Sequence, residues 1–184
     1  PHAPAQTRGG VAIPVWGLVR TSDDVRAAVA EGADGLCFPE PTDSGILEAA
    51  ATAIGGGDLA LTGTPADAAR LAARARVRFV TPPTNPQPLR DHWRSLADPD
   101  APPGPDPLLV ARLGPDDPPD AAAGFDEAIA DADALPLPIL DLPPLRVVAD
   151  GPDDARRAVA AGAVGVLCAP RRIAAVKDAI RDTD

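Results

Sequence analysis

Two consecutive arginines, Arg171 and Arg172, stand directly after the last predicted strand, behind the sequence Cys168-Ala169-Pro170. Barrel proteins commonly bind phosphate near the ends of their last strands through glycine-rich backbone N–H groups. Here Pro170 removes one such donor, but two guanidinium groups can hold an anion through their charge and planar donors. The alternative is that both arginines begin the last helix and face water.

Other side chains capable of chemistry give weaker patterns. His92, one of two histidines, follows a proline-rich loop, and it would either exchange protons near neutral pH or face solvent on a helix. With a single usable histidine and no Cys/His spacing, the sequence predicts no metal site and no cofactor. The only lysine, Lys177, lies on the last predicted helix, which argues against an aldolase-like barrel with a Schiff-base lysine on a strand. These patterns leave the catalytic residues unassigned.

The two cysteines, Cys37 and Cys168, fall at matching ends of predicted strands. Two cysteines do not make a disulfide framework, so we interpret both as buried reduced thiols. Together with a polar N-terminus that lacks an apolar signal core, this predicts a cytoplasmic protein.

The overall charge narrows the choice of partners. The chain has 184 residues and a formal net charge of −10, which disfavours binding to nucleic acid. No apolar run approaches the length needed to span a bilayer, so no membrane is expected. A small anionic metabolite stays possible as a partner, because a local arginine cluster can overrule the global sign.

A unit that occurs twice indicates how these residues are positioned. Residues 23–35 and 153–165 each begin with two aspartates, continue as an alanine-rich helical pattern and end at Gly-Ala-x-Gly before a short apolar run. Aspartates at the start and glycine at the end are typical helix boundaries. Each copy therefore reads as the αβ half of a βαβ unit.

Similar apolar runs alternate with helical patterns along the rest of the chain, which argues for parallel strands joined by helices. We expect an α/β fold, a trimmed or irregular TIM-type barrel of about six to eight parallel strands, because a full barrel usually takes about 250 residues. A doubly wound open sheet is the alternative. The proline-rich middle is the expected place of the trimming, and residues 121–132 are expected to form a helix there. Residues 1–10 are predicted to be a disordered tail, and residues 11–184 a single barrel-like domain.

Three segments, read in order, carry a family resemblance: TSDDVRAAVAEGADGL (21–36), LALTGTPADAA through RFVTPPTN (59–85) and GVLCAPRRIAAVKDAIR (165–181). They resemble the C-terminal domain of phosphoenolpyruvate-utilising enzymes, the group that includes enzyme I of the sugar phosphotransferase system and pyruvate phosphate dikinase. The resemblance implies a TIM-type barrel that binds phosphoenolpyruvate or pyruvate and forms a homodimer.

The chain departs from that family at the residues that do its chemistry. Gly63 and Pro86 stand where the family places the two carboxylates that hold Mg²⁺, and neither supplies an oxygen ligand. The stretches Phe38-Pro39-Glu40 and 147–150 lack the family's phosphate-binding arginine and its acid–base cysteine. The resemblance therefore implies a catalytically degenerate relative that acts as an interaction, dimerisation or regulatory module rather than as an enzyme.

Asn85 remains from the family's pattern, and Arg90 and Arg94 follow closely. The alternative hypothesis is a small metal-independent enzyme, a transferase or lyase, or a binder of a phosphorylated or keto-acid metabolite. Its site would lie at the C-terminal face of the barrel. It predicts that five residues converge on one pocket there: Asn85, Arg90, Arg94, Arg171 and Arg172.

Overall fold

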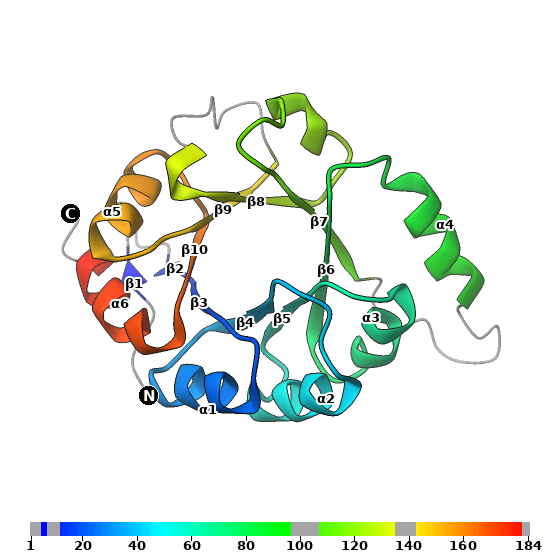
Figure 1. The fold of residues 1–184 in the computed structure, drawn as a ribbon, viewed down its shortest axis with the longest axis horizontal. Coiled ribbons are helices and arrows are strands. Elements are labelled where there is room, and N and C mark those ends of the chain that lie inside the picture. Colours follow the sequence, from blue (N-terminus) through cyan, green and yellow to red (C-terminus); the bar gives the residue numbers. More distant parts are fainter. Residues whose placement is uncertain (1–4, 7–11, 97–106, 135–142, 182–184) are drawn as a thin grey trace.

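The chain folds into a closed barrel of parallel strands (Figure 1). The structure is a computed structural model that describes residues 5–6, 12–96, 107–134 and 143–181. In the described residues, eight strands pair side by side in the order β10-β3-β4-β5-β6-β7-β8-β9, and each neighbouring pair is parallel. The barrel strands are β3 (Val15–Leu18), β4 (Gly35–Phe38), β5 (Asp58–Leu61), β6 (Arg76–Thr81), β7 (Leu108–Arg112), β8 (Glu127–Asp131), β9 (Leu145–Val148) and β10 (Gly165–Cys168).

The pairing between β10 and β3 decides between the two predicted folds. Val166 of β10 is in register with Val15 of β3, so the last strand of the barrel returns to the first. An open doubly wound sheet has two unpaired edges and cannot make this contact. The prediction of a TIM-type α/β barrel is confirmed, and the alternative is wrong.

Helices surround the barrel and connect successive strands (Figure 1). The α-helices are α1 (Ser22–Ala30), α2 (Ser44–Ala53), α3 (Pro65–Leu71), α4 (Gln87–Leu96), α5 (Pro152–Ala160) and α6 (Ile173–Arg181). Short 3₁₀-helices are η1 (Pro119–Ala122), η2 (Ala132–Ala134) and η4 (Pro170–Arg172). Among the described residues, none of these helices has both the length and the hydrophobicity that crossing a bilayer requires.

The connections that are shorter than in a regular barrel are those after β7 and β8, within the proline-rich part of the chain. In the described part of these connections, η1 and η2 stand where a regular barrel has full helices. The helix expected over residues 121–132 is wrong, because this stretch ends η1, turns at Gly124 with φ of +83° and then forms β8. Alanine favours helix intrinsically, but burial of all of β8 except its last residue, which is partly buried, outweighs that preference.

The two sequence repeats are equivalent in the fold, since α1–β4 and α5–β10 are both helix–strand units. The second aspartate of each repeat also accepts an equivalent backbone hydrogen bond. Asp24 Oδ2 accepts a hydrogen bond from the backbone N–H of Arg20 at 3.0 Å, and Asp154 Oδ2 accepts one from Asp150 N–H at 3.2 Å. Each aspartate thereby ties the end of one barrel strand to the first turn of the following helix.

Part of the predicted N-terminal tail takes up regular structure. Strand β1 (Ala5–Gln6) pairs antiparallel with β2 (Ala12–Ile13). Residues 1–4 and 7–10 of that tail lie outside the described residues. The tail over 1–10 and the single domain over 11–184 therefore stay predictions.

Alternation along the strands separates two apolar layers, because successive side chains point to opposite faces of a sheet. The larger layer lies between the barrel and its helices. The smaller layer fills the barrel interior and consists of Trp16, Cys37, Ala60, Val80, Val110, Ile129 and Leu167. The same inward-facing series of strand positions continues to both ends of the barrel, so the side chains at its end positions line the two openings.

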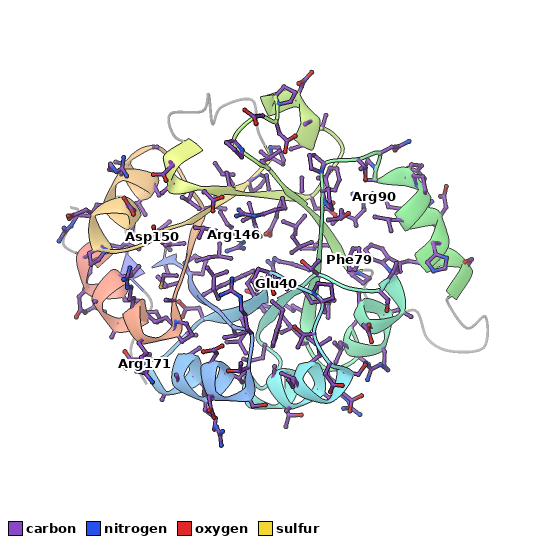
Figure 2. All side chains as sticks on the ribbon, in the orientation of Figure 1. Glu40, Phe79, Arg90, Arg146, Asp150 and Arg171 are labelled. Carbon is purple, nitrogen blue, oxygen red and sulfur yellow. The ribbon has the colours of Figure 1, made fainter. Side chains whose placement is uncertain are left out.

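The N-terminal end of the barrel is closed by buried charged groups around Trp16. Arg78 donates to Glu127 at 3.0 Å and to Asp58 at 2.6 Å, and Arg146 Nε donates to Glu127 at 2.8 Å. Both guanidinium groups also lie over the Trp16 ring. Figure 2 shows Arg146 inside the ring of strands. Arg146 Nη1 and Trp16 Nε1 are buried without a hydrogen-bond partner among the described residues, but the charges themselves are paired with one another. The cluster is therefore a packed plug at the end of the barrel that usually serves stability.

Candidate functional site

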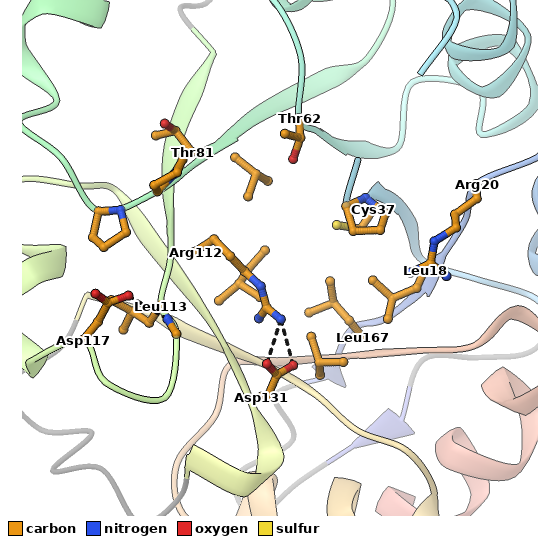
Figure 3. A pocket seen from close by; sticks show the side chains of 17 residues that line it. Leu18, Arg20, Cys37, Thr62, Thr81, Arg112, Leu113, Asp117, Asp131 and Leu167 are labelled. Atoms are coloured by element: carbon orange, nitrogen blue, oxygen red, sulfur yellow. Dashed lines mark hydrogen bonds and ion pairs between the residues drawn. The ribbon is translucent and has the colours of Figure 1, made fainter. Parts of the chain in front are cut away.

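A cavity of about 760 Å³ opens at the C-terminal ends of the barrel strands, the end where TIM-type enzymes place their active sites. Every barrel strand contributes a lining residue, either from the strand or from the position directly after it. The lining residues are Leu18, Arg20, Cys37, Pro39, Thr62, Val80, Thr81, Pro82, Pro83, Arg112, Leu113, Gly114, Asp117, Ile129, Asp131, Val148 and Leu167 (Figure 3). This volume suits a small organic molecule.

The floor of the cavity is apolar. Val80, Ile129 and Leu167 belong to the interior layer of the barrel, and Leu18 and Val148 pack against that layer from the rim. Aliphatic side chains at this depth exclude water and favour an apolar part of a ligand. None of the described lining residues is aromatic, so the described walls provide no surface on which a flat ring would stack.

The charged groups of the cavity follow from the strand alternation. Arg112 is two residues beyond the inward-facing Val110 on β7, and Asp131 is two residues beyond the inward-facing Ile129 on β8. Two-residue spacing keeps these charged side chains on the inner side of the barrel, one level closer to the mouth.

Arg112 and Asp131 form an ion pair across neighbouring strands (Figure 3). Arg112 Nη2 donates to both carboxylate oxygens of Asp131, at 2.7 and 2.9 Å. The Arg112 side chain is 36% exposed and that of Asp131 is 50% exposed, so solvent reaches the pair. Arg112 Nη1 is buried and has no hydrogen-bond partner among the described residues. Arg146 Nη1 in the plug is in the same state, so the group that a ligand can reach is the exposed part of the Arg112 side chain rather than this nitrogen.

Arg20 is the second cationic group at the mouth. It follows β3, and its backbone N–H is fixed by Asp24 in the first turn of α1. The N-cap of this helix is Thr21, and Thr21 and Asp24 hydrogen bond to each other's backbone N–H as a capping box. Arg20 Nε donates to Glu40 Oε1 at a long 3.4 Å.

Cys37 lies at the cavity wall as a neutral thiol. Burial raises the pKa of its thiol to about 12, although the positive charges of Arg112 and Arg146 oppose that shift. Cys168 is buried as well, but it packs in the outer layer, between the barrel and the helices. The reduced, buried state predicted for both cysteines is thus what the structure has. Cys37 is the third residue of β4 and Cys168 the fourth of β10, and this offset of one residue places them on opposite faces of the barrel wall.

The remaining polar lining residues are Thr62, Thr81 and Asp117. Asp117 Oδ2 accepts a hydrogen bond from Gly114 N–H at 2.7 Å, which fixes the loop that follows Arg112. The described residues hold no group of three or more histidine, cysteine, aspartate or glutamate side chains arranged to bind a metal ion.

Asn85 precedes α4, Arg90 lies in its first half and Arg94 in its last turn, and none of them lines the cavity. Asn85 Oδ1 accepts from the backbone N–H of Gln87 at 3.0 Å, at the beginning of that helix. Arg90 donates to Asp126 at 3.1 Å and also to a backbone carbonyl. Arg94 pairs with an aspartate one turn earlier on its own helix.

Arg171 and Arg172 are exposed in η4, directly after β10. Figure 2 shows Arg171 and Arg90 far apart around the barrel. The convergence of the five predicted residues on one pocket is therefore not what the structure has, since none of them lines the cavity at the mouth. Their individual roles in anion binding stay predictions.

Sequence reasoning missed Arg20, Arg112 and Asp131. Asp131 was hidden because its strand was expected to be a helix, and without it Arg112 had no visible partner. A usable signal was present, since each of the two arginines stands two residues beyond an apolar side chain that faces the barrel interior or its rim. A charged residue at that spacing is typical of the mouth of a barrel.

Comparisons with known proteins identify the fold and no family. No family model matches the chain, and no curated protein matches it. A solved structure of phosphoribosyl anthranilate isomerase from Thermus thermophilus aligns with a TM-score of 0.58 over 94% of this chain and 100% of that chain. The two sequences are 14% identical over the alignment, so the similarity shows a common TIM-barrel fold alone.

The predicted membership of the phosphoenolpyruvate-utilising group is wrong. The similar solved structure belongs to a different TIM-barrel family, and no family model supports the three segments. Those segments are helix–strand units of a barrel, and alanine-rich helices before short apolar strands recur in unrelated barrels. The homodimer that the resemblance implied loses its basis with it.

Proposed function

We propose that this protein binds a small organic anion in the cavity at the C-terminal end of its barrel. The observation that carries the proposal is the Arg112 guanidinium, which lines the cavity, is 36% exposed and is held at the wall by Asp131 through Nη2. Planar guanidinium groups bind carboxylates and phosphates through paired N–H donors.

The rest of the cavity supports this assignment. An apolar floor from Ile129, Leu167 and their neighbours would hold the carbon skeleton of the ligand, while Arg112 would orient its anionic end. A hydrogen bond from a charged donor contributes about 1.5–3 kcal/mol, which makes Arg112 the main determinant of anion affinity.

Binding accounts for the lining residues better than cysteine chemistry does. A thiol with a pKa of about 12 is almost entirely protonated at neutral pH, and only the thiolate is an effective nucleophile. Cys37 therefore serves as part of the apolar wall. The Arg112 guanidinium supplies the polar recognition, and Asp131 holds it at the wall.

Isothermal titration calorimetry with small carboxylates and phosphate esters tests the proposal. Arg112→Gln should weaken binding of any anion found by about tenfold or more. Arg94→Gln is the matched control, because Arg94 is exposed, is paired on its own helix and lies outside the cavity lining. Equal binding by the two variants, or no binding of any anion by the wild-type protein, would overturn the proposal.

A further inference from the structure

We propose that the ligand of this cavity carries an anionic group at each end, with Arg112 binding one group and Arg20 the other. The inference rests on the proposed function and specifies the chemical class of the ligand, which is a molecule with two acidic groups and an aliphatic middle. Arg20 is then a binding residue in its own right.

The topology places the two arginines on opposite sides of the mouth. In the closed order β10-β3-β4-β5-β6-β7-β8-β9, four steps separate β3 from β7 in either direction around the barrel. Arg112 is the last residue of β7, and Arg20 follows the end of β3 by two residues. Both line the same cavity, and Figure 3 shows them approaching it from different sides. A ligand that contacts both must therefore cross the mouth.

The surface between them is suited to carbon rather than to charge. Leu18 and Leu167 lie on the β3 side of the floor, and Val80 and Ile129 lie on the side of β6 and β8. Three prolines, Pro39, Pro82 and Pro83, add apolar rim surface without backbone N–H donors. A flexible aliphatic spacer fits this floor, and the described walls hold no aromatic side chain for ring stacking.

Arg20 is available for a ligand because its present partner holds it weakly. Its contact with Glu40 is 3.4 Å long, and the two side chains are 63% and 68% exposed. Exposed ion pairs of this kind contribute about 0–1 kcal/mol, so a ligand anion competes with Glu40 at low cost. The Arg20 backbone, by contrast, is fixed by Asp24, so the side chain turns from a defined point at the rim.

The experiment compares linear α,ω-dicarboxylates of increasing length with monocarboxylates of the same carbon number, by calorimetry on the full chain. At the chain length that spans the mouth, the wild-type protein should bind the diacid about tenfold more tightly than the monoacid. Arg20→Gln should abolish that preference by weakening the diacid more than the monoacid, whereas Arg112→Gln should weaken both ligands. Glu40→Gln should strengthen diacid binding, because it removes the competing carboxylate.

Arg26→Gln is the matched control, since Arg26 is exposed on α1 and pairs with Asp23 there. It should retain the full preference for the diacid, and thermal unfolding should show that each variant is folded. If the wild-type protein binds both acids equally, or Arg20→Gln keeps the preference, the inference is wrong while the anion site at Arg112 stands. If neither acid binds but a phosphate ester does, the inference alone is wrong; if no anion binds, the proposed function fails together with the inference.

Discussion

The guanidinium carbon of Arg146 lies 3.9 Å from the centre of the Trp16 ring, at the end of the barrel away from the cavity. Two glycines make room for this stack. A Cβ at Gly165 would overlap Arg146 Nη1, and a Cβ at Gly35 would lie 2.8 Å from Trp16 Nε1 and 2.9 Å from the Asp58 carbonyl oxygen. These two glycines end the two sequence repeats, so the repeat includes a packing requirement of the barrel interior.

The first prediction concerns this close packing. Gly165→Ala and Gly35→Ala should each lower the free energy of unfolding by about 1–3 kcal/mol, because an added methyl group overpacks a filled interior. Urea unfolding measures the change. Gly63→Ala is the control, since a Cβ there would meet its nearest atoms at 3.9 Å, and it should leave stability nearly unchanged. Equal stability of Gly165→Ala and the control would contradict the packing argument.

The second prediction concerns the buried lysine that joins α6 to the turn between α1 and β4. Lys177 Nζ on α6 donates to Asp34 Oδ1 at 2.9 Å and to the Gly32 carbonyl oxygen at 2.6 Å. Asp34 Oδ2 in turn accepts from the backbone N–H of Val15 at 2.8 Å. Lys177→Met keeps the apolar stem but leaves two acceptors without their donor, which should cost about 2–4 kcal/mol.

Chemical denaturation of Lys177→Met beside Arg26→Met checks this. Arg26 makes only an exposed pair within one helix, and such pairs contribute about 0–1 kcal/mol. A loss in Lys177→Met no larger than that of Arg26→Met would show that the buried contacts are worth no more than surface ones.

The third prediction follows from the pKa of Cys37, which burial raises from 9.0 to about 12. Above pH 9.0 the unfolded chain releases this thiol proton while the folded chain retains it, so the folded state binds more protons and stability falls as pH rises. The contribution is about 1.4 kcal/mol per pH unit within that window. Cys37→Ala should therefore show a shallower loss of stability in urea unfolding above pH 9.0. Parallel pH curves for the wild-type protein and the variant would contradict the burial of the thiol.

The fourth prediction concerns the carboxylate that competes for Arg112. Asp131→Asn removes the negative charge next to the guanidinium, so it should raise the affinity for a small organic anion by about three- to tenfold. Because both side chains are partly exposed, the cost in stability should stay near 1 kcal/mol. Calorimetry with the anion that binds the wild-type protein measures the gain. Asp178→Asn on α6 removes the same charge from an exposed pair and should not change binding.

The barrel was predictable from the sequence because the patterns that indicate its helices and strands each lie within a short stretch of the chain. The repeats 23–35 and 153–165 carry helix boundaries and a short apolar run within about 15 residues, and such units impose parallel strands. Strand β8 was not predictable in this way, because Glu-Ala-Ile-Ala-Asp has the composition of a helix and becomes a strand through burial between β7 and β9.

The error in β8 also explains the error in the site. Asp131 and Glu127 are both on this strand, so the partner of Arg112 at the mouth and the partner of Arg146 in the plug were assigned to the wrong element. Arginines adjacent in sequence, such as Arg171 and Arg172, were a more visible pattern than arginines brought together by topology. A site shared by strands distant in the chain is recognisable only after each strand has been placed.

The pairing of β10 with β3 has a consequence for synthesis on the ribosome. The edge of β3 receives its partner only after about 150 further residues have been made, and Lys177 reaches Asp34 later still. Until then the nascent chain presents an unpaired strand edge, which is a surface prone to association with other chains. Emergence of β10 from the exit tunnel is therefore the event that protects the open edge of β3.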